Sequence, residues 1–153
     1  VAKIREVIPD CGITTDVIAG FSGETEQDHK DTLSLMEQVV FDSAFMFAYS
    51  ERPGTLASRK YPDDIPYELK TERLNEIIAL QGRMSLKSNE KEIGRRLKVL
   101  VEGPSKKNPD ELCGRASSNK MCVFPSRGEK AGDYCEVEVV SVTSATLLCA
   151  RID

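Results

Sequence analysis

Tryptophan is absent from this 153-residue chain, histidine occurs once, and aromatic residues make up 6% of it. Such a chain has few rings on which a nucleobase or a flat cofactor could stack. It also lacks a signal peptide and any apolar run long enough to span a bilayer, so we expect a cytoplasmic protein with no membrane partner. The chain opens without an initiator methionine, on a short uncapped stretch of helical character. We therefore expect a piece of a longer protein.

Cysteine is present but follows no ligand pattern. The cysteines are odd in number and form no CxxC or CxxxCxxC spacing; they are Cys11, Cys113, Cys122, Cys135 and Cys149. These spacings match neither a metal site nor a disulfide framework. We predict reduced, structural thiols and no metal site among these residues.

The net charge of −4 conceals a division along the chain. Residues 1–82 carry 8 basic and 15 acidic side chains, whereas residues 83–130 carry 12 basic and 6 acidic ones. An acidic part joined to a basic segment of net charge +6 indicates an anionic partner for the basic segment.

The first part of the chain has the pattern of an α/β protein. The hydrophobic pattern predicts a strand over residues 15–20 and a helix with one apolar stripe over residues 24–40. It predicts a second strand, buried on both faces, over residues 43–49, "SAFMFAY". A strand, a helix and a strand in this order predict a βαβ unit with parallel strands. Two strands cannot form a stable sheet alone, so we expect more strands from outside the chain. His29 is predicted to lie on the surface of the helix.

The second part of the chain has a different residue pattern. A helix is predicted from Pro66 to a point before Gly94. From Arg96 onward, short strand-like runs alternate with glycine, proline, asparagine and serine. This pattern predicts a small antiparallel barrel of about five strands. The fold class is therefore α/β plus all-β, with a boundary in residues 82–93.

Two loops follow the predicted parallel strands and open on the same edge of the sheet. "GFSGETEQD" places glycines and a helix start where α/β enzymes bind ligands, although a simple tight turn has the same composition. "YSERPGT" offers Tyr49 for stacking and Arg52 for a carboxylate or phosphate, although an incidental surface arginine is equally compatible. Two such loops on one edge favour a binding site.

The basic stretch "EGPSKKNPDELCGRASSNK" lies in the turns of the predicted barrel. Small barrels of this kind bind RNA through strands and loops, and cations supply the salt-sensitive part of the affinity. Solvated turn lysines are the alternative. The residues that we predict to contact RNA are Lys106, Lys107, Arg115, Asn119 and Lys120. Aromatic side chains for base stacking are scarce here, since only Phe124 and Tyr134 occur.

Three long motifs, in this order, carry a family resemblance over nearly the whole chain. "TTDVIAGFSGET", "FDSAFMFAYSERPGT" and "VEGPSKKNPDELCGRASSNKMCVFP" together resemble the bacterial tRNA methylthiotransferases of the MiaB type. The usual family forms, GFPGETEEDF and YSPRPGT, differ here at Ser22, Gln27, His29 and Glu51.

The resemblance implies a carboxy-terminal fragment of such an enzyme. Residues 1–82 would be the last part of a radical S-adenosylmethionine (SAM) barrel of the TIM type, and residues 85–150 a TRAM domain that holds tRNA. Ile18 and Gly20 would flank the adenine of SAM, with Glu24 near that pocket and Tyr49 and Arg52 on the adjoining loop.

The full enzyme would add a methylthio group to isopentenyl-adenosine beside the anticodon, as a monomer with SAM and two 4Fe-4S clusters. The cysteines that ligate these clusters in the family are not among the five present, so we expect the chain alone to be inactive. Two alternatives remain open: the sister branch, which modifies an aspartate of a ribosomal protein, and a non-catalytic RNA-binding module.

Overall fold

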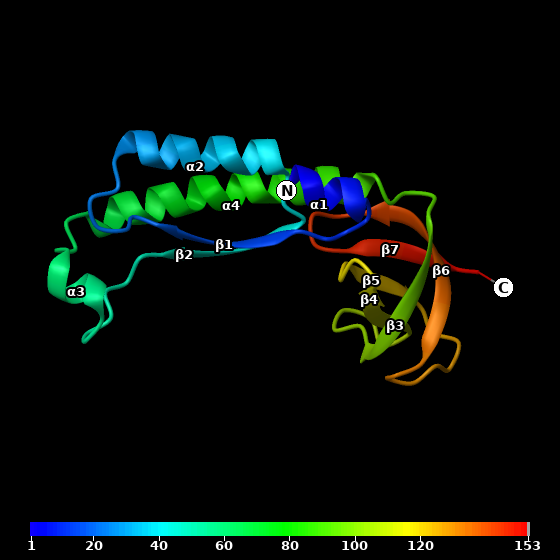
Figure 1. Ribbon diagram of the computed structural model, residues 1–153. Helices are drawn as coiled ribbons and strands as arrows, with labels where there is room; N and C mark the ends of the chain where they lie inside the picture. Colours follow the sequence, from blue (N-terminus) through cyan, green and yellow to red (C-terminus); the bar gives the residue numbers. More distant parts are fainter. Residues whose placement is uncertain (153) are drawn as a thin grey trace. The chain divides into compact units, whose positions relative to one another are not determined.

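The computed structural model describes residues 1–152, which form two compact units (Figure 1). One unit comprises Ile13–Met84, and the other combines Val1–Gly12 with the chain from Ser85 onward. The division falls inside helix α4 (Tyr67–Glu90). Each unit has a hydrophobic core of its own.

The first unit is built on a parallel strand pair. Strand β1 (Thr14–Ala19) pairs with β2 (Ser43–Ala48) along their whole length, and helix α2 (Glu26–Val39) connects them. The predicted βαβ unit is therefore confirmed. Helix α2 begins at a capping box, in which Asp28 N donates to Thr25 Oγ1 at 3.2 Å and Thr25 N donates to Asp28 Oδ2 at 2.8 Å.

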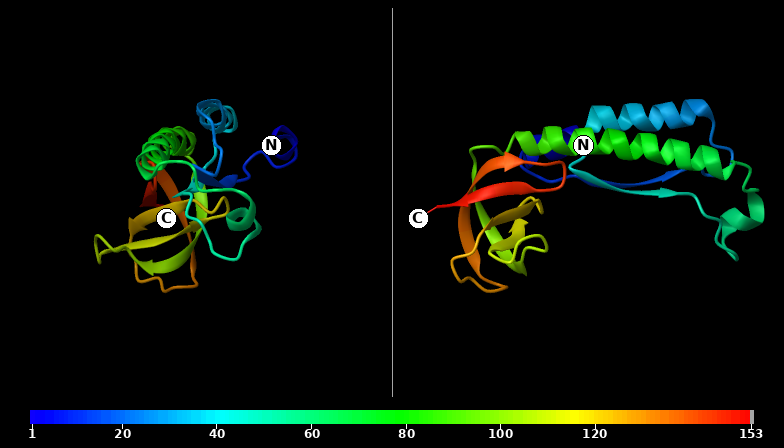
Figure 2. Two further views of the ribbon diagram at one scale, coloured as in Figure 1. Left: turned by 90° about the vertical axis from the view of Figure 1, so that its left-hand side faces the viewer. Right: turned by 180° about the vertical axis from the view of Figure 1, so that it is seen from behind.

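Helices α2 and α4 cover one face of this sheet (Figures 1 and 2). The core between them contains Ala19, Met36, Phe41, Ile77 and Leu80. Side chains on the opposite face are exposed: Ile18 by 54%, Phe45 by 65% and Phe47 by 54%. The prediction that residues 43–49 are buried on both faces is thus wrong for this chain, because its helices cover one side of the sheet.

Two helices follow β2. The short α3 (Leu56–Lys60) begins at Thr55, whose hydroxyl accepts from Ser58 N at 3.2 Å. Helix α4 begins one residue after Pro66 and ends before Gly94, as the sequence predicts. No helix within residues 1–152 is both long enough and apolar enough to cross a membrane.

The second unit contains a closed barrel of five strands, with the short helix α1 (Ala2–Val7) preceding it in sequence. Inward side chains alternate along each strand and form one core. The strands, in the order in which they pair around the barrel, are β3 (Arg96–Pro104), β4 (Glu111–Ala116), β5 (Met121–Pro125), β7 (Leu147–Arg151) and β6 (Tyr134–Val142).

The strand directions correct one prediction. The barrel is mixed rather than antiparallel, because β5 and β7 pair in parallel through Cys122 with Leu147 and Val123 with Leu148. An odd number of strands cannot alternate in direction around a closed ring, so two neighbours must run the same way. The sequence pattern predicts the number of strands but not this closure.

The barrel core also accounts for most of the cysteines. All five are free, and Cys122, Cys135 and Cys149 are buried among the apolar side chains of the barrel. Burial raises the pKa of the Cys135 thiol and so favours its protonated form. These three residues are structural thiols.

Candidate functional site

The turn after β1 is held by the carboxylate of Glu24. Glu24 Oε2 accepts from Gly20 N at 2.9 Å, and Glu24 Oε1 accepts from Arg73 Nη1 at 2.8 Å. Gly20 and Gly23 have φ angles of 75° and 77°, in the left-handed region that glycine adopts without strain. Glu24 therefore ties the turn of "GFSGET" to helix α4.

Lys70, on the same helix, packs directly under the turn. A Cβ atom on Gly20 would lie 2.3 Å from Lys70 Cγ, so glycine is required for this close approach. The Lys70 ammonium pairs with the carboxylate of Asp63 and donates to the carbonyl oxygen of Tyr49 at 3.4 Å. Lys70 thus joins the loops that follow β1 and β2.

Lys70 and Arg73 are the residues that sequence reasoning missed at this edge. Both are buried, and both occupy the stripe of α4 that continues with Ile77 and Leu80. A charged residue at a core-facing helical position was the available signal, because burying a charge requires a paired partner.

The predicted cofactor residues lie at the carboxyl ends of β1 and β2. The ring of Tyr49 packs edge-on against Phe21, with centroids 4.9 Å apart, and Tyr49 N donates to Ala19 O at 2.8 Å. Ile18 points to the exposed face of the sheet. Arg52 lies on the loop beyond, where its side chain is exposed and its carbonyl oxygen accepts from Thr55. The structure therefore brings Gly20 and Glu24 into direct contact and links Tyr49 to the same turn through Ala19, Phe21 and Lys70. Ile18 lies on β1 and Arg52 on the loop after β2.

His29 differs from its predicted surface position. The side chain is buried, with 3% of the residue exposed, and its Nε2 lies 2.8 Å from Glu76 Oε2. This pair connects α2 to α4. The polar surroundings in the sequence did not reveal that α4 covers this part of α2.

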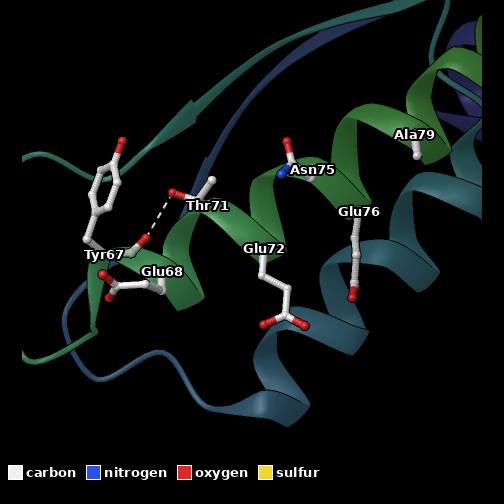
Figure 3. A pocket seen from close by; sticks show the side chains of 7 residues that line it. All are labelled: Tyr67, Glu68, Thr71, Glu72, Asn75, Glu76 and Ala79. Atoms are coloured by element: carbon white, nitrogen blue, oxygen red, sulfur yellow. Dashed lines mark hydrogen bonds between the residues drawn. The ribbon is translucent and has the colours of Figure 1, made fainter.

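A shallow groove of about 720 Å³ lies along α4 (Figure 3). Its lining is Tyr67, Glu68, Thr71, Glu72, Asn75, Glu76 and Ala79. All of these residues come from one helix, and the Thr71 hydroxyl donates to the carbonyl oxygen of Tyr67 within it. The groove is formed by the outer surface of α4.

The predicted RNA contacts divide between the two ends of β4. Lys106 and Lys107 are exposed on the loop that enters this strand. Arg115 and Asn119 lie at its other end, where Arg115 Nη1 donates to Asn119 O at 3.0 Å across the hairpin turn. The structure therefore does not bring all five residues into one group.

Lys120 has a structural partner set of its own. Its Nζ donates to Ser88 O at 3.1 Å and Ser88 Oγ at 3.0 Å and lies 3.2 Å from Glu92 Oε1. The side chain is 9% exposed. In this arrangement Lys120 fastens the β4–β5 hairpin to the end of α4 and does not reach toward solvent.

A second basic loop lies beside the loop that carries Lys106 and Lys107. Ser126 N donates to Asp110 O at 3.0 Å, which places the β5–β6 loop beside the β3–β4 loop. The β5–β6 loop carries Arg127 and Lys130, both exposed. We call the two loops, residues 105–110 and 126–133, the basic loop pair. The sequence analysis did not include Arg127 and Lys130, because their proximity depends on the register of the β4–β5 pair, in which Glu111 lies opposite Pro125.

The acidic residues of the β5–β6 loop are used within the fold. Glu129 accepts from Arg127 N at 2.9 Å and pairs with Arg151, and Asp133 Oδ2 accepts from Lys130 N at 2.8 Å. The hydrogen bond from the Arg127 backbone is the main cause that lowers the pKa of Glu129. These carboxylates shape the loop that presents Arg127 and Lys130.

Comparisons with known proteins give a family match and a match to a solved structure. The TRAM domain family matches residues 90–149, which include the whole β3–β6 part of the barrel. Among solved structures, the apo form of Mycoplasma genitalium RNase R has 12% identity over 56% of this chain and 18% of that chain, with a TM-score of 0.30.

Curated relatives are similar along nearly the whole chain. The tRNA-2-methylthio-N(6)-dimethylallyladenosine synthase of Phocaeicola vulgatus is 51% identical, and that of Bacteroides fragilis 52% identical, each over 96% of this chain and 32% of the relative. The same-named enzyme of Amoebophilus asiaticus is 52% identical over 99% of this chain and 32% of the relative. These findings confirm the resemblance to tRNA methylthiotransferases of the MiaB type. The chain spans about a third of the length of these relatives.

Proposed function

We propose that this chain is the part of a tRNA methylthiotransferase that completes its SAM-binding barrel and holds its tRNA substrate. The proposal is carried by two features that occur together in one chain similar to the synthases. One is a glycine turn, held by Glu24, at the carboxyl edge of a parallel sheet, and the other is a barrel with a basic loop pair. The reaction would be methylthiolation of isopentenyl-adenosine next to the anticodon.

The proposed domains follow the sequence-based division. Residues 1–82 would belong to the radical SAM core and residues 85–150 to the TRAM domain. The exposed face of the β1–β2 sheet supports this assignment, because Ile18, Phe45 and Phe47 there require a cover that these described residues do not supply. In the whole enzyme the cover would be the remaining strands of the barrel and the cofactor.

The residues at the edge of the sheet fit part of a SAM site. Ile18 offers an exposed apolar side chain, and Gly20 allows close approach of the backbone at the end of β1. Tyr49 and Arg52 would lie on the neighbouring loop, where a ring and a guanidinium suit adenine and a carboxylate respectively. When bound, SAM would supply the radical chemistry.

Glu24 would act by positioning rather than by touching the cofactor. Both of its carboxylate oxygens are occupied, one by Gly20 N and the other by Arg73. Lys70 would act in the same way, since its ammonium is shared between Asp63 and the Tyr49 carbonyl. These contacts would keep the two loops at a fixed separation while the ligand binds.

The 4Fe-4S clusters would be held by residues outside this chain. Residues 1–152 contain no group of three histidine, cysteine or acidic side chains that could hold a metal ion. Since three of the cysteines are core residues of the barrel, they do not fit a cluster site.

The TRAM domain would hold the anticodon stem-loop of tRNA through the basic loop pair. Lys106, Lys107, Arg127 and Lys130 would contact phosphates, and such contacts position RNA without reading its sequence. The enzyme would work as a monomer in the cytoplasm, where its tRNA substrate is found.

The test is an anaerobic activity assay on the natural gene product that carries this chain, reconstituted with iron and sulfide. Incubation with SAM, a reductant and tRNA containing isopentenyl-adenosine should yield the 2-methylthio nucleoside by mass spectrometry. Modification of a ribosomal-protein aspartate instead would assign the protein to the sister branch. No product from either substrate would leave an RNA-binding module as its function.

A further inference from the structure

Tyr134 is the aromatic ring of the barrel that reaches solvent. Residues 85–153 contain two aromatic side chains, and Phe124 is buried in the core. Tyr134, the first residue of β6, is 61% exposed. A large exposed ring next to polar surface is typical of a binding position, because Tyr has an apolar body and a polar tip.

A cation holds this ring from one side. Lys98 Nζ lies 4.8 Å from the centroid of the Tyr134 ring, and the two residues come from neighbouring strands. The contact limits the rotation of an exposed side chain and keeps a cation at the ring. A ring that is fixed in advance loses less entropy when a ligand stacks on it.

The ring continues into a row of side chains across four strands. Leu100 pairs with Tyr134 on β6 and with Arg115 on β4, and Arg115 pairs with Met121 on β5. Inward and outward side chains alternate, and the buried neighbours Val99 and Val101 point inward, so Leu100 points outward. We call Tyr134, Leu100, Arg115 and Met121 the outer row. It places a ring, apolar side chains and a guanidinium on neighbouring strands at the outer surface of the barrel.

The outer row begins directly beside the basic loop pair. Tyr134 follows the β5–β6 loop in sequence, and hydrogen bonds join this loop to β3, from Val101 N to Asp133 O and from Gly132 N to Val101 O, both at 2.9 Å. Phosphates bound by Arg127 and Lys130 would therefore bring the attached nucleotides close to the Tyr134 ring.

We propose that Tyr134 is a stacking site for an unpaired nucleobase of the bound RNA. This inference rests on the proposed RNA binding of the barrel and adds to it a contact that does not depend on charge. Lys98 and Arg115 would border the base, and the basic loop pair would hold the neighbouring phosphates. Every nucleobase has a flat face that can stack on an aromatic ring, so the site would accept any unpaired base.

The observations favour RNA over a protein partner at this position. A protein interface would require a large apolar patch, whereas charged residues border Tyr134 and its neighbour Leu100: Lys98 lies opposite Glu136 in the strand register, Arg115 Nε lies 3.4 Å from Glu102 Oε1, and Arg127 and Lys130 lie on the preceding loop. One ring among charges suits a single base on a polar backbone.

The experiment compares two polyanions that bind to the 153-residue chain, a single-stranded RNA octamer and inorganic polyphosphate. Polyphosphate has the charges of RNA but no bases. The variant Tyr134→Ala should bind the RNA roughly tenfold more weakly, in keeping with the loss of one base–aromatic stack. Its affinity for polyphosphate and the salt dependence of its RNA binding should not change, because tyrosine is uncharged.

Two further proteins complete the test. Tyr134→Phe keeps the ring and should recover the RNA affinity, and Tyr67→Ala removes an exposed tyrosine of α4 as a matched control. In wild-type protein, added RNA should shift the Tyr134 ring proton resonances upfield, as a stacked base does. Circular dichroism checks that each variant is folded.

Each outcome decides one of the two proposals. If wild-type protein binds RNA but Tyr134→Ala binds it equally well, or if the ring resonances stay unshifted, the stacking site is refuted while RNA binding stands. If Tyr134→Ala weakens polyphosphate as much as RNA, the residue acts on the fold of the loop and the stacking site is again refuted. If the wild-type chain binds neither polyanion, the proposed RNA binding fails together with the stacking site.

Discussion

Ser126 donates its backbone N–H to the carbonyl oxygen of Asp110 at 3.0 Å, and this one hydrogen bond joins two loops that are separate in sequence. It places Lys106 and Lys107 on one loop beside Arg127 and Lys130 on the other. The proposed anion-binding surface is therefore formed by the antiparallel pairing of β4 with β5, which brings the loops before β4 and after β5 together, rather than by a continuous basic segment.

The glycines of the β1–α2 turn provide the first prediction. Gly20→Ala and Gly23→Ala both place a Cβ at a positive φ angle, which costs about 1–2 kcal/mol. Gly20→Ala also pushes its Cβ against Lys70 Cγ, whereas Gly23 has no heavy atom within 4 Å of the added Cβ. We expect Gly20→Ala to destabilise the protein by at least about 1 kcal/mol more than its matched control, as measured by urea unfolding. Equal losses of stability in the two variants would mean that the Lys70 side chain moves away from the added Cβ without measurable cost.

A second prediction concerns the pair formed by Glu24 and Arg73, whose side chains are both largely buried. Replacing Arg73 with Met leaves a buried carboxylate without its cation, so the free energy of opening of β1 and β2 should fall by about 3 kcal/mol. Hydrogen exchange of the amides in these strands measures this quantity.

The double variant with Glu24→Gln tests whether the pair acts as a unit. The loss in the double variant should be smaller than the two single losses together by about 1 kcal/mol or more. Strictly additive losses would show that Glu24 and Arg73 act independently.

The carboxylate of Asp28, at the start of helix α2, should make the stability of the protein depend on pH. The hydrogen bond from Thr25 is the main cause that lowers the pKa of Asp28 below its usual value of 3.8. A carboxylate with a lowered pKa in the folded state stabilises the fold above its unfolded pKa, and this contribution is lost as the pH falls through the folded value. Wild-type protein should therefore be more stable than Asp28→Asn at about pH 6, and the difference should shrink as the pH falls below about 4. A difference that stays constant in thermal melts over this range would contradict the role of the ionised carboxylate.

The cysteines lead to a prediction about metal binding. Cys122, Cys135 and Cys149 fill the barrel core, so they are not available as ligands while the barrel is folded. Anaerobic reconstitution of the 153-residue chain with iron and sulfide should give no stoichiometric 4Fe-4S absorption. A stable cluster spectrum from the folded chain would show that its thiols form a site.

The sequence predicted the helices and strands better than the way in which the strands pair around the barrel. Regular patterns gave the βαβ unit, the long helix after Pro66 and five strands, since each is a local feature of hydrophobic spacing. The parallel contact of β5 and β7 is a property of the closed ring and has no local signal. The exposed face of the β1–β2 sheet depends in the same way on which elements cover it.

The candidate sites show the same limit. The pattern identified Gly20, Glu24 and Tyr49, which the structure gathers at one edge, but not Lys70 and Arg73, which hold that edge together from α4. Proximity in sequence suggested that Lys120 acts with Lys106 and Lys107. Instead Lys120 pairs with Glu92 at the opposite end of β4. The loop that lies beside Lys106 and Lys107 is the one that carries Arg127 and Lys130.

The most direct measurement is a salt titration of tRNA binding by the 153-residue chain. Replacing Lys106, Lys107, Arg127 and Lys130 with Ala should weaken all tRNAs alike and lower the log–log slope by about one unit for each phosphate that is no longer bound. The matched control replaces four exposed lysines elsewhere, Lys3, Lys30, Lys87 and Lys91, and so removes the same charge. We predict that the control keeps a slope close to that of wild-type protein. Equal slopes in the two variants would show that affinity follows net charge alone, and would contradict an RNA interface at the basic loop pair.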